Sequence, residues 1–373
     1  MTKKVSLITV HTGPNFGTVL QVIATVKVLH QNGLETEVVN YIPPRDDLQR
    51  IKAETKEHIR QGKSIIHKFF RCYGGYKRIS RFRKNDRIYI GCLEKYVNMS
   101  TPIHSSDSFA EKCPRADFYV TGSDQVWNTV YNEGVDSHYF FDGIKGIKIA
   151  FSSSIGQTEL TEEEKGLFSI YLKEYKKISV RESSAVKLLS EIGIPSVNLI
   201  DPTLMLNRNE WGEVLNGKRL HKKDYLLVYI PYNIHDKEEI YSLARRVANA
   251  RGLQVITFSW SRDKELLADY TYKDASPLDF LSLMYYASFV ITNSFHGTAF
   301  SINLNREFLV FLPTKFVSRV EDILTMVDLK SRLVPYGGAN TFNLQGSIDY
   351  SNANTILESK RKEVRDFIKD SFV

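Results

Sequence analysis

The sequence predicts an α/β protein made of two doubly wound domains that face a cleft. Short apolar runs typical of buried strands alternate with segments whose apolar residues recur at helical spacing. The alternation pauses near residues 195–222 and then resumes, which divides the chain into two sets. Because repeated strand–helix units form parallel sheets covered by helices, each set predicts one such domain. A ligand is expected between them, at the carboxyl ends of the strands.

The first set of elements predicts a domain of residues 1–200. A strand is expected at residues 4–10, then a turn and a helix at 18–31, and Gly33 suits the cap after that helix. The remaining elements of this domain are strands at residues 35–42, 116–120, 148–152 and 177–180, and a helix at 182–192.

The second set predicts a domain of residues 201–350, which opens with a strand-end turn at Asp201-Pro202-Thr203. Pro277 supports a helix at its position, because proline is favoured in a first helical turn. The expected elements are strands at 225–230, 253–258, 308–312 and one beginning at 289, and helices at 235–250, 277–286, 317–327 and one beginning at His296. A final helix at 352–368, within the segment 351–373, is expected to pack back across the first domain.

Residues 45–100 interrupt the strand–helix rhythm and predict a basic insertion of two helices, which include residues 64–70 and 76–83. Residues 45–95 contain 15 Lys and Arg against 6 Asp and Glu, a net charge of +9 in a chain whose total is +7. Two interpretations are open: a solvated helical insertion, or a patch that docks on an anionic membrane surface.

Composition narrows the class of protein. The chain is 42% hydrophobic and 25% charged, which is ordinary for a globular protein. No hydrophobic core of a secretory signal and no membrane span is visible. The cysteines are odd in number and are not spaced like metal ligands, so we expect a reduced, cytoplasmic protein. No nucleic-acid motif, dinucleotide fingerprint, Walker loop or Cys/His cluster occurs, so we expect no nucleic-acid partner, no cofactor and no metal.

The segment Ser294-Phe295-His296-Gly297 is the strongest candidate for a functional site. It follows an apolar strand and begins a helix, so backbone N–H groups there favour an anion. A histidine at that position can exchange protons near neutral pH. This turn therefore predicts half of an active site that handles a phosphorylated donor.

Polar residues follow two other strands. After the strand at 116–120, Asp124, Gln125 and Asn128 could bind sugar hydroxyls and Trp127 could stack on a sugar, although an ordinary turn with a core tryptophan is also open. Arg181 closes the strand at 177–180 and could hold a carboxylate or phosphate in two hydrogen bonds. A salt bridge from Arg181 to a neighbouring acid is the alternative.

Two further cations, Lys315 and Arg319, follow the strand that ends at Leu312. They are expected at the same sheet edge as His296, where they could attract the same anion. The alternative is that both are solvated loop cations.

Taken in order, these segments resemble the polysaccharide pyruvyl transferase family. The matching pieces are Asn15-Phe16-Gly17 with Leu20-Gln21, Gly122-Ser123-Asp124-Gln125-Val126-Trp127-Asn128, Ser152-Ser153-Ser154-Ile155-Gly156, Ser179-Val180-Arg181-Glu182, Asp201-Pro202-Thr203-Leu204 and Ser294-Phe295-His296-Gly297. The resemblance implies a GT-B-like fold of two Rossmann-like domains. It also implies transfer of the pyruvyl group of phosphoenolpyruvate to two hydroxyls of a sugar, giving a cyclic ketal in cell-surface or exopolysaccharide biosynthesis.

The resemblance also implies roles for individual residues. Arg181, His296 and Lys315 match the residues held to engage phosphoenolpyruvate, and Gly297 and Arg319 would complete that site. His296 is the expected proton-transfer group, and Asp124 is the expected partner that orients or deprotonates an acceptor hydroxyl. The acceptor side falls in the first domain, with the expected contacts Asn15, Phe16, Gly17, Ser123, Gln125, Trp127 and Asn128.

Two other functions are compatible with the same pattern. One is a GT-B glycosyltransferase that uses a nucleotide sugar, although no clear Glu pair is visible in the second domain. The other is a non-catalytic glycan-pathway protein with this fold. The expected partners are phosphoenolpyruvate and a sugar acceptor, with a lipid-linked acceptor and a peripheral position at the inner face of the membrane as options.

Overall fold

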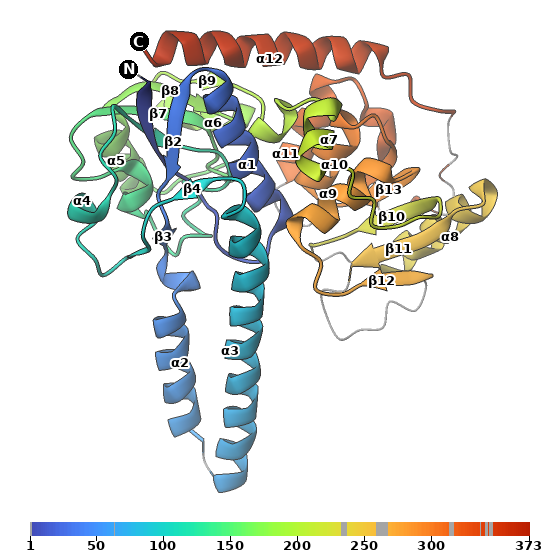
Figure 1. Ribbon diagram of the computed structural model, residues 1–373, viewed down its shortest axis with the longest axis horizontal. Coiled ribbons are helices and arrows are strands. Elements are labelled where there is room, and N and C mark those ends of the chain that lie inside the picture. The colour runs from blue at the N-terminus through green and yellow to red at the C-terminus, as the bar shows by residue number, and fades with distance from the viewer. Residues whose placement is uncertain are drawn as a thin grey trace.

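The computed structural model describes residues 2–62, 64–232, 237–258, 268–312, 317–335, 337–339, 342 and 346–373. Two parallel β-sheets with surrounding helices lie side by side, and a helical hairpin projects from the first of them (Figure 1). The predicted α/β class, with two Rossmann-like doubly wound units, is confirmed.

The first sheet has seven parallel strands in the order β4-β2-β1-β6-β7-β8-β9. The strand order reverses between β1 and β6, which marks the place where such sheets bind ligands. Its strands are β1 (Lys3–Ile8), β2 (Leu34–Val38), β4 (Asn98–Met99), β6 (Phe118–Thr121), β7 (Ile147–Ser153), β8 (Tyr175–Val180) and β9 (Val197–Asn198).

The second sheet has six parallel strands in the order β12-β11-β10-β13-β14-β15, so its order reverses between β10 and β13. Tyr229 at the end of β10 pairs with Thr292 at the end of β13, which aligns the loops that follow them. Its strands are β10 (Tyr225–Tyr229), β11 (Gln254–Phe258), β12 (Tyr270–Tyr272), β13 (Phe289–Thr292), β14 (Glu307–Phe311) and β15 (Leu333–Val334).

The sequence prediction was wrong in one strand. Residues 35–42 do not form a single strand, because β2 ends at Val38 and the chain then enters β3 (Tyr41–Ile42), which pairs with β5 (Ile103–His104) outside the main sheet. The backbone N–H of Asn40 donates to Ser100 Oγ instead of continuing the ladder. An alternating apolar pattern alone did not reveal this change of partner.

Helices cover both sheets and set the positions of the loops. They are α1 (Phe16–Gln31), α4 (Phe109–Lys112), α5 (Glu162–Leu172), α6 (Ser183–Glu191), α7 (Arg208–Leu215), α8 (Lys237–Arg251), α9 (Pro277–Tyr286), α10 (Phe295–Asn303), α11 (Val317–Met326) and α12 (Ser351–Ser371). Short 3₁₀ turns are η1 (Pro44–Asp46), η2 (Ser137–Phe140), η3 (Pro202–Leu204) and η4 (Lys330–Arg332).

One hydrophobic core joins the two sheets. It contains apolar residues of the first sheet, α1, α7, α9, α10 and α12, while separate cores fill the outer face of each sheet. At its centre, Phe16 stacks on Tyr89 and Phe280 with ring centroids 5.6 and 5.0 Å apart, and Trp211 packs against Phe300. Because apolar burial dominates folding, this shared core fixes the two sheets against each other.

The C-terminal helix α12 runs along both halves of the molecule (Figure 1). Lys3 Nζ donates to the carbonyl of Phe372 at 2.6 Å, which ties the helix to the start of the first sheet. Arg361 Nε donates to the carbonyl of Leu204, and its Nη2 donates to Asn303 Oδ1 on α10. The helix therefore contacts elements of both sheets.

The insertion is a hairpin of α2 (Leu48–Arg60) and α3 (Ile65–Leu93). The prediction of two helices is confirmed, but residues 64–70 and 76–83 both belong to the α3 region rather than to separate helices. The helices are joined by an ion pair of Arg78 with Glu54 at 3.0 Å and by a hydrogen bond from Arg71 to the carbonyl of His58.

Candidate functional site

The loops at the switch points of the two sheets touch each other. Gly17 begins α1 after β1, and its Cα lies against the imidazole of His296, which begins α10 after β13. A Cβ added at Gly17 would lie 2.1 Å from His296 Nδ1, closer than any real contact. Glycine is therefore required at position 17 for the imidazole to occupy its place.

His296 is enclosed by the two halves of the molecule. The residue is 5% exposed, and its Nε2 is buried without a hydrogen-bond partner among the described residues. Burial lowers the pKa of His296 below its ordinary value, and the carboxylates of Asp201 and Asp124 oppose this effect. A buried polar atom without a partner is costly, so this nitrogen is suited to receive a ligand.

The α10 N-terminus is capped by Ser294, whose hydroxyl accepts from the Gly297 amide at 3.4 Å. Gly297 itself has no room for a side chain, because a Cβ would lie 2.2 Å from Thr292 Oγ1. The amide of Gly297 is thus directed at Ser294, and the N–H groups of Phe295 and His296 form the rest of the first turn.

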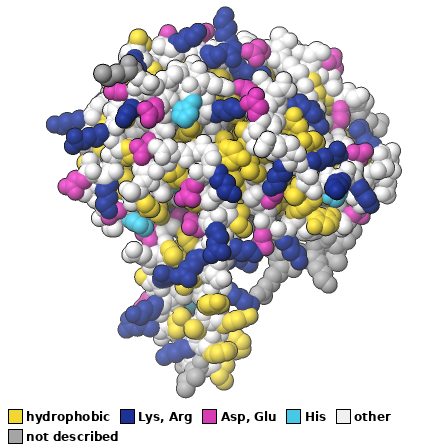
Figure 2. Space-filling model, viewed as in Figure 1, with side chains coloured by type: hydrophobic (Ala, Val, Ile, Leu, Met, Phe, Trp, Pro, Cys, Tyr) yellow, Lys and Arg dark blue, Asp and Glu magenta, His cyan; other side chains and the backbone are white. Residues whose placement is uncertain are grey.

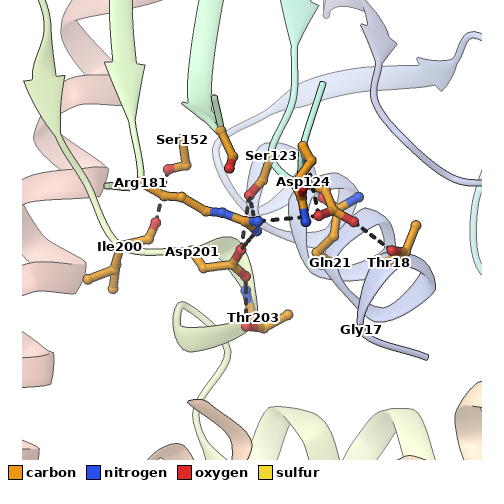
Figure 3. Close-up of polar contacts among 12 residues, drawn as sticks. Gly17, Thr18, Gln21, Ser123, Asp124, Ser152, Arg181, Ile200, Asp201 and Thr203 are labelled. Carbon is orange, nitrogen blue, oxygen red and sulfur yellow. Dashed lines mark hydrogen bonds and ion pairs between the residues drawn. The ribbon is translucent and has the colours of Figure 1, made fainter. Parts of the chain in front are cut away.

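Arg181, at the end of β8, is the centre of a buried ion-pair cluster (Figure 3). Its side chain is 1% exposed. Nη1 donates to Asp201 Oδ2 at 2.7 Å and to Ser123 Oγ at 3.4 Å, and Nη2 donates to Asp124 Oδ1 at 3.3 Å. Ser123 Oγ in turn donates to Asp201 Oδ2 at 3.0 Å. Arg181 therefore forms salt bridges to neighbouring acids, which was the alternative interpretation of this residue from the sequence.

The two aspartates of this cluster are held in their charged forms. Burial alone would raise their pKa values and is the largest single effect, but for Asp201 the charges of Arg181 and His296 and the hydrogen bonds from Thr203 together exceed it and bring the pKa of Asp201 to about 2. The same balance lowers the pKa of Asp124, whose Oδ2 also accepts from Thr18 Oγ1 at 2.5 Å. Asp124 has a φ of 70°, in the left-handed region that Asp tolerates better than most residues.

Asp201 is a site residue that sequence reasoning placed in an ordinary turn. It does cap η3, since Oδ1 accepts from the Thr203 amide at 2.9 Å and hydroxyl at 2.7 Å. Its other oxygen faces Arg181. The sequence signal that could have identified Asp201 as a site residue is its position directly after an apolar stretch, at a sheet edge where other polar residues were expected.

Glu182 lies beside the cluster and differs from the aspartates. Burial raises the pKa of Glu182 above its ordinary value, although Arg181 opposes this. Ser154 Oγ hydrogen-bonds to Oε1, while Oε2 is buried and has no hydrogen-bond partner within the described ranges. Glu182 is therefore the carboxyl group of this cluster whose pKa is shifted toward the protonated form, whereas the pKa values of Asp124 and Asp201 are lowered.

The second sheet contributes a buried cation from α11. The Nη atoms of Arg319 lie 3.2 and 3.3 Å from the outer amide atom of Gln125, which becomes a hydrogen-bond acceptor when the oxygen faces them. Arg319 and Arg181 both lie near the ring of Phe295, at 5.8 and 5.1 Å from its centroid. Lys315, the other predicted cation, lies outside the described residues.

The predicted sugar contacts of Trp127 and Asn128 are wrong. Trp127 is 1% exposed and stacks on Phe140 at 5.4 Å, so its ring cannot meet a ligand. Asn128 is fully buried, its Nδ2 lies 2.7 Å from the inner amide atom of Gln125, and its Oδ1 accepts from the Tyr131 amide. Aromatic neighbours distant in sequence created this core, which the local motif could not indicate.

Two other predicted acceptor contacts are occupied by the protein. Ser123 is fully buried and bonds within the cluster, so it does not face an acceptor as predicted. Asn15 is half-buried, and its Oδ1 caps α1 by accepting from the amides of Gly17 and Thr18. Of the predicted acceptor residues, Gln125 is half-buried and is the one best placed, whereas Phe16 is 2% exposed and packs in the shared core.

Phe16 is buried but lines one end of a groove of about 970 Å³ between α3 and the second sheet. Lys84 of α3 and Asp274 after β12 form an ion pair across it at 2.5 Å. The cations along the groove are Lys77, Arg78, Arg81, Lys84 and Lys273. A basic groove thus leads to the start of α1, one residue from Gly17.

Within the described ranges, no three His, Cys, Asp or Glu side chains are grouped so that they could hold a metal ion. The helices of the described part of the chain include none that is long and apolar enough to cross a bilayer. The site is thus composed of buried Arg, Asp, Glu and His side chains at strand ends.

Comparison with known proteins agrees with this architecture. A family model described as polysaccharide pyruvyl transferase matches residues 15–313, which include Gly17, Asp124, Arg181, Asp201 and His296. None of the curated sequences compared with the chain matches it. Among solved structures, UDP-GlcNAc 2-epimerase from Methanocaldococcus jannaschii is similar with a TM-score of 0.51 and 11% identity, over 98% of this chain and 99% of that one.

A UDP-N-acetylglucosamine 2-epimerase from Rickettsia bellii is also similar, with a TM-score of 0.47 and 11% identity, over 99% of this chain and 98% of that one. At such low identity the likeness to the Methanocaldococcus jannaschii structure shows the fold alone, which is the predicted GT-B-like arrangement.

Proposed function

Because this chain belongs to the polysaccharide pyruvyl transferase family, we propose that it moves the pyruvyl group of phosphoenolpyruvate onto two hydroxyls of one saccharide. The product is a cyclic ketal. The observation that carries this proposal is the buried, unpartnered Nε2 of His296 at a helix N-terminus beside Arg319 and the Arg181 cluster.

The donor is proposed to bind between the α10 N-terminus and Arg319. Phosphoenolpyruvate carries a phosphate and a carboxylate, which suit a helix N-terminus and a guanidinium. Both Nη atoms of Arg181 are engaged by carboxylates, and its Nε is the one guanidinium nitrogen without a hydrogen bond in the described structure. Arg181 is therefore proposed to act mainly by positioning Asp124 and Asp201, and Lys315 remains a proposed donor contact by resemblance.

Substrate charge is proposed to activate His296. Before binding, burial keeps its pKa below the ordinary value and the imidazole neutral at pH 7. The anionic donor adds negative charge beside it and raises that pKa. The resulting imidazolium is the general acid, a role typically worth about 10²–10⁴ in rate.

The proposed reaction balances as follows. The proton of the His296 imidazolium adds to the terminal vinyl carbon, leaving a cationic centre at the carbon that bears the phosphate. A first saccharide hydroxyl attacks that centre and loses its proton. The carbon–oxygen bond to phosphate then breaks, and a second hydroxyl closes the ring as its proton is lost. One of the two released protons restores the imidazolium and the other leaves with inorganic phosphate.

Glu182 is a better proposed base for the acceptor hydroxyl than Asp124. Its raised pKa and unpartnered Oε2 allow it to take up a proton. The pKa of Asp124 is lowered and both of its oxygens accept hydrogen bonds, from Thr18, Gln125 and Arg181. Asp124 is accordingly proposed to stabilise charge on His296 rather than to move a proton.

The acceptor is proposed to approach along the basic groove that ends at Phe16. Its cations suit a saccharide that carries anionic groups. Gln125, half-buried next to Arg319, is the proposed hydrogen-bonding contact nearest the donor.

Thermal shift with phosphoenolpyruvate, with and without EDTA, tests the donor proposal. Millimolar phosphoenolpyruvate should stabilise the protein by mass action, chelation should not change this, and His296→Asn should reduce it. UDP-sugars are the comparison ligands, because a nucleotide-sugar glycosyltransferase is the rival function. Stabilisation by a UDP-sugar with none by phosphoenolpyruvate would favour that rival.

A further inference from the structure

The α2–α3 hairpin presents an apolar face that no described element covers. Four side chains on α3 are strongly exposed: Ile66 at 70%, Phe69 at 68%, Phe70 at 65% and Tyr76 at 71%. Such large exposed aromatic groups usually mark an interaction site. We propose that this face docks the protein on an anionic lipid bilayer.

The spacing of these residues places them on one side of the helix. Positions 66, 69, 70 and 76 fall within about a third of the turn, since 3.6 residues complete each turn. The opposite side of α3 faces α2, through Arg71 to the His58 carbonyl and Arg78 to Glu54. The apolar face is therefore not needed to hold the hairpin together.

Charge identifies the partner as an anionic surface. Residues 48–93 contain 13 Lys and Arg but only 3 Asp and Glu. Glu54 and Glu57 are already paired with arginines of the hairpin. A second copy of the chain would bring like charges together, whereas an anionic bilayer attracts each nearby Lys or Arg.

Figure 2 shows this division of the projecting hairpin, with hydrophobic side chains along one side and Lys and Arg along the other. Arg81 stands beside the apolar face by helical spacing and forms no ion pair among the described residues. Aromatic rings that enter the headgroup region while basic groups meet phosphates are the ordinary form of interfacial binding.

The structure also narrows the sequence prediction, which assigned docking to residues 45–95. Phe82 is half-buried and lines the groove toward the second sheet, so it does not belong to the docking face. Ile66, Phe69 and Phe70 do not line that groove, whereas Tyr76 lies where the docking face meets it. The docking proposal is therefore tested at Phe69 and Phe70, which are apart from the proposed transferase site.

Co-sedimentation of the full-length protein with vesicles tests the proposal. Binding to phosphatidylcholine vesicles containing phosphatidylglycerol should exceed binding to pure phosphatidylcholine by at least about tenfold, and salt should weaken it. The double variant Phe69→Ser/Phe70→Ser should lose most of this binding. Ile170→Ser, which removes a 64% exposed apolar side chain from α5, is the matched control and should bind normally.

A Phe70→Trp variant locates the face directly. Its fluorescence should shift to the blue with anionic vesicles and be quenched by brominated lipid chains. The proposal is overturned if binding is equal on neutral and anionic vesicles or if Phe69→Ser/Phe70→Ser binds like wild type. It is also overturned if the double variant changes only the oligomeric state measured by sedimentation without lipid.

Discussion

At the scale of residues, the site depends on how charge is balanced around one imidazole. His296 lies near two aspartates, Asp124 and Asp201, whose pKa values are lowered beside Arg181. Glu182, whose pKa is raised by burial, lies next to the same arginine. Such divergent environments for neighbouring carboxyl groups are typical of sites that move protons. The account therefore predicts that binding and protonation are coupled.

Phosphoenolpyruvate binding should take up a proton at His296. The imidazole is neutral at pH 7 before binding, because burial lowers its pKa, and becomes charged beside the anion. Proton uptake means that affinity rises as pH falls toward 7 from above. Titration calorimetry in buffers of different ionisation enthalpy measures it. The His296→Asn variant is the control, because any proton uptake that it still shows comes from the ligand itself. If proton uptake in His296→Asn equals that of the wild type, the coupling is refuted.

Gly17→Ala should disable the site while leaving the fold intact. The new Cβ would displace the imidazole of His296, and a misplacement of about 1 Å can cost about 10²-fold in rate. Gly166→Ala is the matched control, because Gly166 is also helical and no atom lies within 4 Å of its added Cβ. Comparable turnover in both variants, with normal thermal melting, would show that the contact is unimportant.

Replacing Arg181 should lower stability as well as ligand binding. Arg181→Met leaves Asp124 and Asp201 buried without their counter-charge, a loss typically of about 3–5 kcal/mol. Arg181→Lys should recover only part of the lost stability, since a point charge cannot span both carboxylates. Urea unfolding at pH 7 measures the difference.

Arg50→Met is the control for that experiment. Arg50 pairs with Glu54 and Glu133 on the surface, where solvent screens the charges and an ion pair contributes little to stability. If Arg181→Met unfolds at the same urea concentration as Arg50→Met, then Arg181 is a ligand clamp and not the support of the two aspartates.

At the scale of elements, the sequence revealed most of the sheet strands and the helix at each switch point. Apolar runs and helical spacing predicted α9 at its observed bounds and α1, α6 and α11 to within two residues. The short strands β9, β12 and β15 and the helices α5 and α7 had no prediction. Short edge strands carry too few residues for a period to be recognised.

The sequence predicted part of the candidate site, because the geometry of parallel sheets limits where strand-end residues can lie. Residues at strand ends, such as Arg181, Asp124 and His296, could be brought together by the rule that parallel strands end at one edge. What the sequence could not supply was side-chain direction. Trp127 turned into an aromatic core and Asp201 turned toward Arg181, and both outcomes depend on partners remote in sequence.

The helix α12 should contribute to stability through its contact with the shared core. Leu357 is 1% exposed within that core, so Leu357→Ala should cost about 2–5 kcal/mol in unfolding free energy. Lys362→Ala, at an exposed position of the same helix, should change it by less than about 0.5 kcal/mol. Thermal and urea unfolding compare them, and equal effects would mean that α12 is loosely attached.

At the scale of the whole molecule, the fold explains why the site lies where it does. Each sheet has one reversal of strand order, and the loops at these two reversals contact each other at Gly17 and His296. A shared hydrophobic core holds that contact in place, and Asp322 of α11 reaches across to the amide and hydroxyl of Ser183. The donor and acceptor are thus proposed to meet between two fixed halves.

The most direct test of the central claim is label transfer from phosphoenolpyruvate. The protein is incubated with carbon-13-labelled phosphoenolpyruvate and a panel of free and lipid-linked saccharides, and the saccharides are examined by mass spectrometry. The account predicts that the labelled carbons appear in a saccharide as inorganic phosphate is released, and that His296→Asn abolishes both. If no saccharide gains the label while a UDP-sugar in a parallel reaction donates its sugar to the same panel, the account is contradicted.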